Sequence, residues 1–92
     1  MNRDAKNLPD DELKNLGSSI RRTRQLRNLS QGALAAKCNF QRNYVCGVER
    51  GSRNIRFLSL LVIARALGTT VSELVDGADA LGRSANKERP AS

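Results

Sequence analysis

The chain has 92 residues, a length that supports one small domain and leaves little room for a deep catalytic cleft. Only 3% of the residues are aromatic, so a core must be built from Leu, Ile, Val and Ala, and no apolar stretch of about 18 residues predicts a membrane span. The net charge is +7, and residues 16–76 hold it with ten basic against three acidic side chains. That concentration favours a polyanionic partner, and a basic surface that only keeps the protein soluble is the alternative.

The N-terminal sequence lacks the apolar segment of a secretory signal, so we expect a cytoplasmic protein. Two cysteines without any histidine are too few for a zinc site, and a disulfide is not expected in the cytosol. Cys38 is expected to be buried in the core, whereas Cys46 either packs under its helix or faces outward, with a redox switch as a minor alternative. Without histidine, a metal cluster or a phosphate-binding loop, we expect no cofactor and no enzymatic activity.

The first helix of the chain is expected to follow a polar N-terminal arm. Residues 1–12 predict this flexible arm, although the acids Asp10-Asp11-Glu12 suit the positively polarised start of a helix. From there the helix is expected to run to about Asn28, with apolar residues at loosely helical spacing among several arginines.

Two short helices are predicted next, separated by a tight turn. Ser30 is a strong N-cap residue for a helix over residues 31–37. Asn39 tolerates the left-handed conformation that ends a helix, and a further helix is expected from Gln41 to Arg50, ended by Gly51. A helix, a short turn and a second helix in this order form the helix-turn-helix pattern.

The last predicted helices are separated by Gly68. The apolar run FLSLLVIARAL over residues 57–67 predicts the fourth helix, with Asn54 as its cap. Thr70, with Glu73 three residues later, predicts a capping box for a fifth helix ending at Val75. Residues 77–92 are small, polar and charged, and predict a flexible C-terminal tail.

The stretch NFQRNYVCGVERGSRN, residues 39–54, combines an apolar helical stripe with a basic, amide-rich face. Arginine hydrogen-bonds guanine O6 and N7, and asparagine hydrogen-bonds adenine N6 and N7, so Arg42 and Asn43 suit the edges of bases in the major groove. The sequence therefore predicts a DNA-recognition helix. The alternative for Arg42 is a solvated surface arginine without a partner.

The span 16–75 resembles the helix-turn-helix domain of the lambda Cro/repressor (XRE) family. The matching motifs, in chain order, are LG at 16–17, IRRTR at 20–24, LSQGALA at 29–35, YVCGVERGSRN at 44–54 and IARALGTTVSEL at 63–74. The pattern Tyr-x-x-x-x-Glu-Arg-Gly-x-Arg-Asn is most similar to the controller proteins of restriction–modification systems. The resemblance implies an all-α fold, a compact five-helix lambda-repressor-like domain over residues 13–76.

The resemblance also implies roles for individual residues. Arg42 and Asn43 would stand at the exposed start of the recognition helix, flanked by Gln41 and Tyr44. Gln41 and Tyr44 would touch phosphate or a thymine methyl group. The alternative for Tyr44 is packing at the rim of the domain.

Three further residues are expected to contact the DNA backbone and so to fix the register of the protein on the duplex. Gln31 would clamp a phosphate at the N-terminus of its helix, and Arg53 and Asn54 would hold the other side of the groove. Gly47 lies within the recognition helix, where a glycine is unfavourable, and we interpret it as a site of close approach to the duplex.

The family resemblance further implies an ion pair and a dimer. Arg24 and Glu49 would form a partly buried pair between the first and third helices. The fourth helix is more apolar than a monomer needs, and its expected core residues are Phe57, Leu60, Ile63, Ala64 and Leu67. Its remaining apolar residues, Leu58, Leu61 and Val62, are predicted to form a homodimer interface together with the fifth helix. The alternative is that these residues are buried under the N-terminal arm.

The expected function is therefore a sequence-specific regulator of transcription that binds double-stranded DNA as a dimer. Two recognition helices about 34 Å apart would read an inverted-repeat operator. Contact with RNA polymerase is a further expectation if the operator lies beside a promoter. A restriction–modification controller is favoured, and the alternative is an antitoxin or phage-type repressor with a protein partner, in which residues 77–92 bind a toxin.

Overall fold

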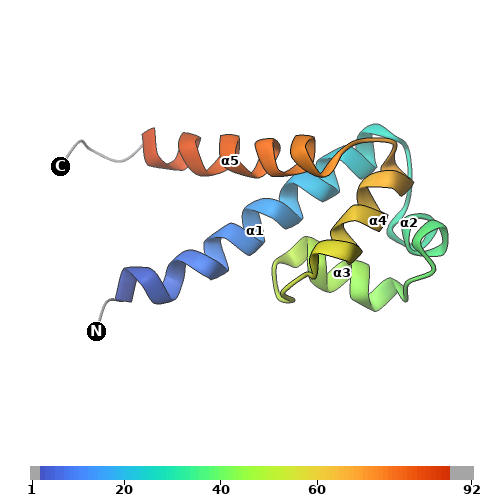
Figure 1. The fold of residues 1–92 in the computed structure, drawn as a ribbon, viewed down its shortest axis with the longest axis horizontal. Coiled ribbons are helices and arrows are strands. Elements are labelled where there is room, and N and C mark those ends of the chain that lie inside the picture. The colour runs from blue at the N-terminus through green and yellow to red at the C-terminus, as the bar shows by residue number, and fades with distance from the viewer. Residues whose placement is uncertain (1–2, 88–92) are drawn as a thin grey trace.

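The computed structural model describes residues 3–87, and the surroundings of side chains over residues 11–82. Every regular element in residues 3–87 is an α-helix, and the five helices surround one core (Figure 1). They are α1 (Arg3–Leu26), α2 (Gln31–Cys38), α3 (Arg42–Arg50), α4 (Phe57–Leu67) and α5 (Val71–Lys87). The all-α, five-helix prediction is confirmed.

The helix-turn-helix unit has the predicted caps. The hydroxyl of Ser30 accepts the Ala33 backbone N–H at 3.0 Å, which satisfies one of the free donors at the start of α2. Asn39 ends α2 at φ 58°, and Gly51 ends α3 at φ 74°, both in the left-handed region that reverses the chain. These caps fix the lengths of two helices that are too short to be stable alone.

The other helix ends match the sequence in part. Thr70 caps α5, because its hydroxyl accepts the Glu73 backbone N–H at 3.0 Å. The expected cap of α4 is wrong: Arg56, in an extended conformation, is the N-cap residue, and Asn54 lies two residues before it. Since no side chain caps α4, its position depends on the burial of its apolar face.

The core is aliphatic, as the low aromatic content predicts. Its largest fully buried side chains are Ile20, Leu34, Val45, Ile63, Leu67 and Leu74. On α4 the predicted core residues are buried except one: Phe57 is 65% exposed, because it stands in the first turn before the helix reaches the core. Cys38 is buried in this core, and burial raises the pKa of its thiol.

The side chains of Arg24 and Glu49 form a buried two-pronged ion pair between α1 and α3, as the resemblance implies. Arg24 donates from Nε to Glu49 Oε2 at 2.7 Å and from Nη2 to Oε1 at 3.0 Å. Its third nitrogen, Nη1, donates to the backbone carbonyl of Leu29 at 2.8 Å. Hydrogen bonding to Glu49 raises the pKa of Arg24 above its ordinary value, against the opposing effect of burial.

The same contact between α1 and α3 requires a glycine. A methyl group on Gly17 would lie 2.4 Å from the backbone oxygen of Glu49 and 2.5 Å from that of Val48. Only a residue without a side chain lets α1 approach α3 this closely. Gly17 thus sets the distance at which Arg24 and Glu49 meet.

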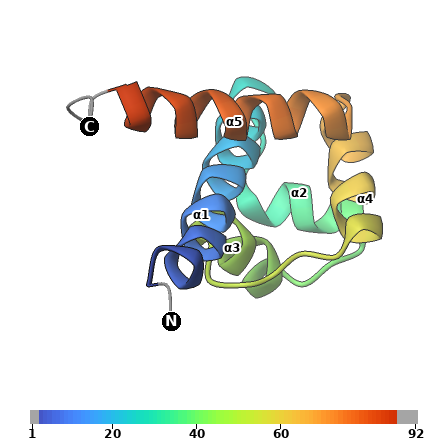
Figure 2. The same cartoon turned by 60° about the vertical axis from the view of Figure 1, so that its left-hand side comes forward.

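Helices α1 and α5 are both longer than the sequence predicted. Helix α1 begins at Arg3 rather than near Asp10, so the expected arm over residues 1–12 is helical from Arg3 onward. Helix α5 ends at Lys87 rather than at Val75, so the expected flexible tail is helical over residues 77–87, and residues 88–92 lie outside the described part. Figure 2 shows α5 crossing α1.

Small residues explain the extension of α5. The hydroxyl of Ser19 donates to the carbonyl of Leu74 at 2.8 Å in a buried contact between the two helices. A methyl group on Gly77 would lie 2.5 Å from that hydroxyl, so the small residue lets α5 continue close along α1. The small residues of this segment predict a flexible tail from composition alone, but in the folded protein they allow α5 to pack against α1.

Within residues 3–87 no single helix is long and apolar enough to cross a membrane. Among these residues, only α4 and Val71–Gly82 taken together have that length and composition, and the two segments are bent by 100° relative to each other. In the same described part of the chain, no group of three or more His, Cys, Asp or Glu side chains is placed to hold a metal ion.

We expect Arg24→Ala to destabilise the domain by about 3–5 kcal/mol, because it leaves the buried Glu49 carboxylate without its partner. Such a loss is a large part of the stability of a small domain. Urea unfolding followed by circular dichroism measures it. Arg22→Ala, which removes an exposed arginine from the same helix, should stay within about 0.5 kcal/mol of wild type. Wild-type melting of Arg24→Ala would contradict the role of the pair.

Gly17→Ala should also destabilise the domain, by about 1–3 kcal/mol, since the new methyl group meets backbone rather than a movable side chain. Gly32→Ala is the matched control: its nearest neighbours would be 3.9 Å away, so no clash arises. The same unfolding experiment should place Gly32→Ala at or above wild-type stability. Equal stability of the two variants would show that α1 can move away from α3 without cost.

Candidate nucleic-acid interface

The recognition helix α3 separates its side chains into a buried and an exposed side. Val45 and Val48 are buried in the core, whereas Gln41, Arg42 and Asn43 are exposed at the N-terminal end. Because α3 is only nine residues long, its first turn carries most of its exposed hydrogen-bonding groups. The predicted base-reading residues therefore stand together at one end of a helix whose other side is held by the core.

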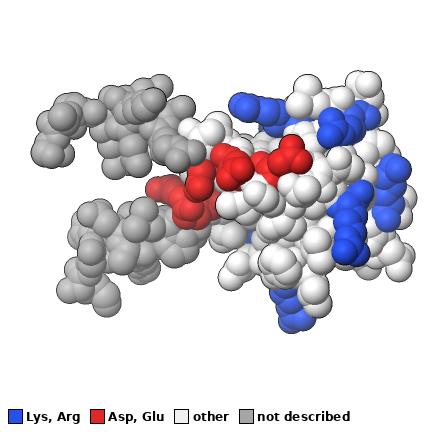
Figure 3. Space-filling view, turned by 45° about the horizontal axis from the view of Figure 1, so that its top comes forward, with Lys and Arg blue, Asp and Glu red and all other residues white. Residues whose placement is uncertain are grey.

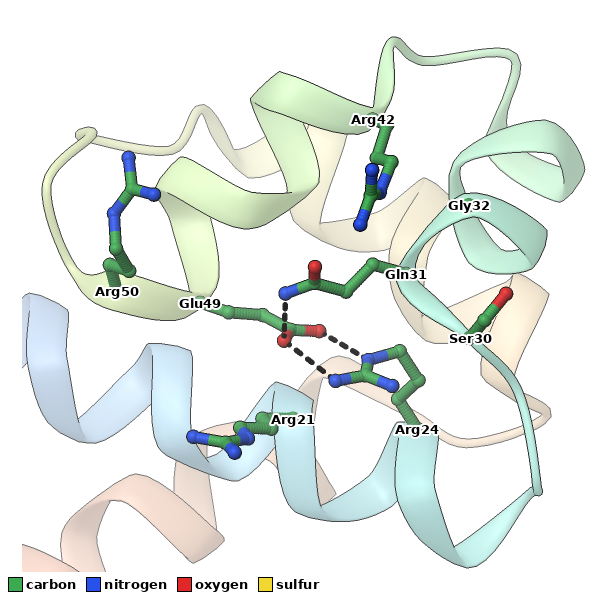
Figure 4. Close-up of a pocket in the computed structure, with 8 residues that line it drawn as sticks. All are labelled: Arg21, Arg24, Ser30, Gln31, Gly32, Arg42, Glu49 and Arg50. Atoms are coloured by element: carbon green, nitrogen blue, oxygen red, sulfur yellow. Dashed lines mark hydrogen bonds and ion pairs between the residues drawn. The ribbon is translucent and has the colours of Figure 1, made fainter.

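A cleft of about 570 Å³ lies between α1, the start of α2 and α3 (Figure 4). Its lining residues are Arg21, Arg24, Ser30, Gln31, Gly32, Arg42, Glu49 and Arg50. Arg24 and Glu49 neutralise each other within it, so its net field comes from Arg21, Arg42 and Arg50. Sequence reasoning missed Arg21 and Arg50. Arg21 precedes Arg24 by three residues, a spacing that places both on one side of α1.

The side chain of Gln31 is fixed inside this first cleft rather than extended into solvent. Its Nε2 donates to Glu49 Oε1 at 3.0 Å, and its Oε1 accepts from the Cys46 thiol at 2.9 Å. The ion pair of α1 and α3 thus reaches α2 through one amide group. Cys46 is half-buried and directed at α2, which places its thiol between the two helices of the helix-turn-helix unit.

A second cleft, of about 550 Å³, lies on the other side of the recognition helix. Its lining residues are Asn39, Phe40, Gln41, Asn43, Tyr44, Arg53, Asn54, Arg56 and Ser59. Tyr44 is half-buried, with its ring edge-to-face with Phe40 at 5.1 Å between centroids. The guanidinium carbon of Arg53 lies 5.7 Å from the centre of the same ring, within cation–π range.

The structure therefore divides the predicted contact residues between two clefts that flank α3. Gln31 and Arg42 line the first, and Gln41, Asn43, Tyr44, Arg53 and Asn54 line the second. Arg56 joins the second cleft without having been predicted. It lies in the loop before α4, where no periodic pattern marks a side chain as facing a site.

Charge is distributed unevenly over the described surface. Glu49, which is paired and buried, is the only acidic residue of α2, α3 and α4, and the exposed acids over residues 11–82 all lie on α1 and α5. Figure 3 shows acidic side chains gathered in one group and basic side chains spread over the rest of that face. The helix-turn-helix part of the molecule therefore carries basic side chains without an exposed acid, and this surface suits a polyanion.

Comparison with known proteins agrees with this geometry. Residues 20–74 match the family model described as helix-turn-helix. The control protein C.SmaI of Serratia marcescens is 38% identical over 60 residues, which cover 65% of this chain and 71% of that protein.

Two solved structures are also similar. The restriction-modification controller protein C.AhdI from Aeromonas hydrophila is 40% identical with a TM-score of 0.66, over 67% of this chain and 94% of that one. The controller protein C.Esp1396I, solved as a tetramer in complex with its natural 35 base-pair operator, is 30% identical with a TM-score of 0.65, over 73% and 93%. The chain belongs to the helix-turn-helix family of the Cro/repressor type, together with controller proteins of restriction–modification systems.

Proposed function

We propose that this protein is a dimeric, non-catalytic regulator of transcription in the cytoplasm that binds an inverted-repeat operator in double-stranded DNA. The observation that carries the proposal is the exposed first turn of α3, where Gln41, Arg42 and Asn43 stand together on the basic part of the surface. The operator complex of C.Esp1396I supports it, since that relative is 30% identical over most of this chain. We further propose the controller of a restriction–modification system as the biological role.

The first turn of α3 would read base edges in the major groove. Arg42 can donate two hydrogen bonds to guanine O6 and N7, and Asn43 can pair with adenine N6 and N7. Gln41 precedes them as the N-cap residue, in an extended backbone conformation. Its own side chain makes no capping bond, so its amide remains available to the DNA.

Backbone phosphates would lie on both sides of the recognition helix. In the first cleft the positively polarised start of α2 stands beside Arg42. The Gln31 amide uses one N–H on Glu49, and its second N–H is left to donate to a phosphate oxygen. In the second cleft Arg53 and Asn54 would hold the opposite strand. These contacts fix the register and leave sequence reading to the first turn of α3.

The dimer would form through an apolar patch on α4, which we define as Phe57, Leu58, Leu61 and Val62. Leu58 is 71% exposed, Phe57 65% and Val62 38%, and Leu61 is half-buried. Four apolar side chains on two successive turns make a contiguous patch that a second copy can cover. Phe57, predicted as a core residue, therefore joins the proposed interface instead. The operator's place relative to a promoter would then decide between occlusion and contact with RNA polymerase.

Selection of binding sites from random duplex DNA tests the reading of sequence. Wild-type protein should enrich an inverted repeat, and Arg42→Ala should lose preference at defined bases, at a cost of about 1–3 kcal/mol for each lost bidentate contact. Arg22→Ala, an exposed arginine that lines neither cleft, should select the wild-type site. If the wild-type protein enriches no sequence and binds all duplexes with a steep salt dependence, the basic surface is a general electrostatic one.

Leu58→Glu should convert the dimer to a monomer, because each subunit would place a charge in an apolar interface. Sedimentation equilibrium measures the change. Leu26→Glu is the matched control, since Leu26 is 69% exposed on α1 and is not part of the α4 patch, so its substitution should leave the dimer intact. A wild-type protein that sediments as a monomer, or a dimeric Leu58→Glu variant, would argue against the α4 patch as the interface.

A further inference from the structure

The side chain of Arg53 lies across a glycine of the recognition helix. A methyl group placed on Gly47 would be 3.0 Å from both Cδ and Nε of Arg53 and 3.1 Å from its Cγ. These distances are shorter than ordinary van der Waals contact, so Arg53 would have to move if position 47 carried a side chain. The space left by the glycine is already filled by an arginine of the same chain.

Two aromatic rings continue the surface on which Arg53 lies. Tyr44 precedes Gly47 by three residues, on the same side of α3, and the Arg53 guanidinium carbon is 5.7 Å from its ring centre. Phe40 holds that ring edge-to-face and packs against the core itself. The aliphatic part of the Arg53 side chain therefore passes over Gly47, where the helix has no side chain. Its guanidinium group lies over the Tyr44 ring, whose orientation Phe40 fixes.

The backbone before Arg53 is tied to the same glycine. The Gly47 carbonyl accepts the Ser52 backbone N–H at 3.0 Å and the Ser52 hydroxyl at 3.1 Å. Two hydrogen bonds to one carbonyl fix the loop directly before Arg53. The backbone of position 47 thus fixes where the Arg53 side chain begins, and the missing side chain of Gly47 leaves the space in which it lies.

We propose that Gly47 is a positioning residue for Arg53: it leaves the groove across α3 in which Arg53 is held over Tyr44, ready to contact DNA in the second cleft. This inference rests on the proposed function, and it names a residue that affects DNA binding without touching the DNA. An arginine already ordered in the free protein loses less conformational freedom on binding than one that is mobile. The interpretation of Gly47 as a site of close approach to the duplex is replaced by a contact within the protein.

The proposal predicts a DNA-binding defect without a loss of stability. Alanine is a better helix former than glycine, and its methyl group would displace only a flexible arginine side chain, so Gly47→Ala should unfold at or above the wild-type temperature. Its affinity for the duplex selected by the wild-type protein should fall roughly three- to tenfold, the cost of ordering one long side chain on binding. A substitution that acted only through the fold would lower both quantities.

A double-mutant cycle tests whether the effect passes through Arg53. The affinities of wild type, Gly47→Ala, Arg53→Ala and the double variant are measured on the selected duplex. We expect Gly47→Ala to weaken wild-type binding and to change nothing further in the Arg53→Ala background. Full affinity of Gly47→Ala, equal losses in both backgrounds, or an Arg53→Ala variant that binds as wild type would each overturn the proposal.

A measurement without DNA separates this proposal from the proposed function. The Arg53 guanidinium carbon lies 5.7 Å from the centre of the Tyr44 ring, so the ring current of Tyr44 shifts the Arg53 side-chain protons in a nuclear magnetic resonance spectrum. Those protons should be shifted upfield in wild type and return toward ordinary values in Gly47→Ala. Unchanged Arg53 shifts in the variant would overturn the positioning role. Failure of wild type to select any duplex, with the shifts as expected, would instead overturn the proposed function.

Discussion

The buried ion pair of Arg24 and Glu49 holds α1, α2 and α3 together. The pair joins α1 to α3, and both side chains make further hydrogen bonds. The third nitrogen of Arg24 donates to the carbonyl of Leu29, and one carboxylate oxygen of Glu49 also accepts from Gln31. One charged pair therefore touches α1, the loop before α2, α2 itself and α3. Its geometry satisfies the groups that burial would otherwise leave without partners, which is the condition under which a buried pair is tolerated.

The recognition helix needs such external support. Nine residues are too few for a helix to persist alone in water, so the direction in which Arg42 and Asn43 point is decided by what lies behind α3. Behind it are buried valines, the ion pair and the close approach of Gly17. The precision of the proposed DNA contacts is thus set on the side of the helix that faces away from the DNA.

The two clefts that flank α3 differ in how their polar groups are held. In the first, hydrogen bonds fix Gln31 between Cys46 and Glu49, and arginines supply the positive charge. In the second, an arginine lies over an aromatic ring and crosses a glycine, with few hydrogen bonds of its own. Both arrangements place long polar side chains in one orientation before any partner is present, which lowers the entropic cost of binding.

The fold class, the helix-turn-helix order and most of the helix ends can be predicted from the sequence, because these follow from local signals. Ser30, Asn39, Gly51 and Thr70 act on backbone groups within a few residues, so their effects can be predicted without knowing the fold. The family resemblance also implied the Arg24–Glu49 pair and seven of the residues that line the two clefts, but not Arg21, Arg50 or Arg56.

Other features follow from contacts between residues far apart in the chain, and these arise only when the helices pack together. Helix α5 continues to Lys87 because Ser19 and Gly77 let it lie against α1, although its composition predicts a flexible tail. Phe57 is exposed and Gln31 is held inside its cleft for the same kind of reason: neighbours from other helices, rather than neighbours in sequence, define their surroundings. Gly47 shows this most clearly, since only the folded chain brings Arg53 across it.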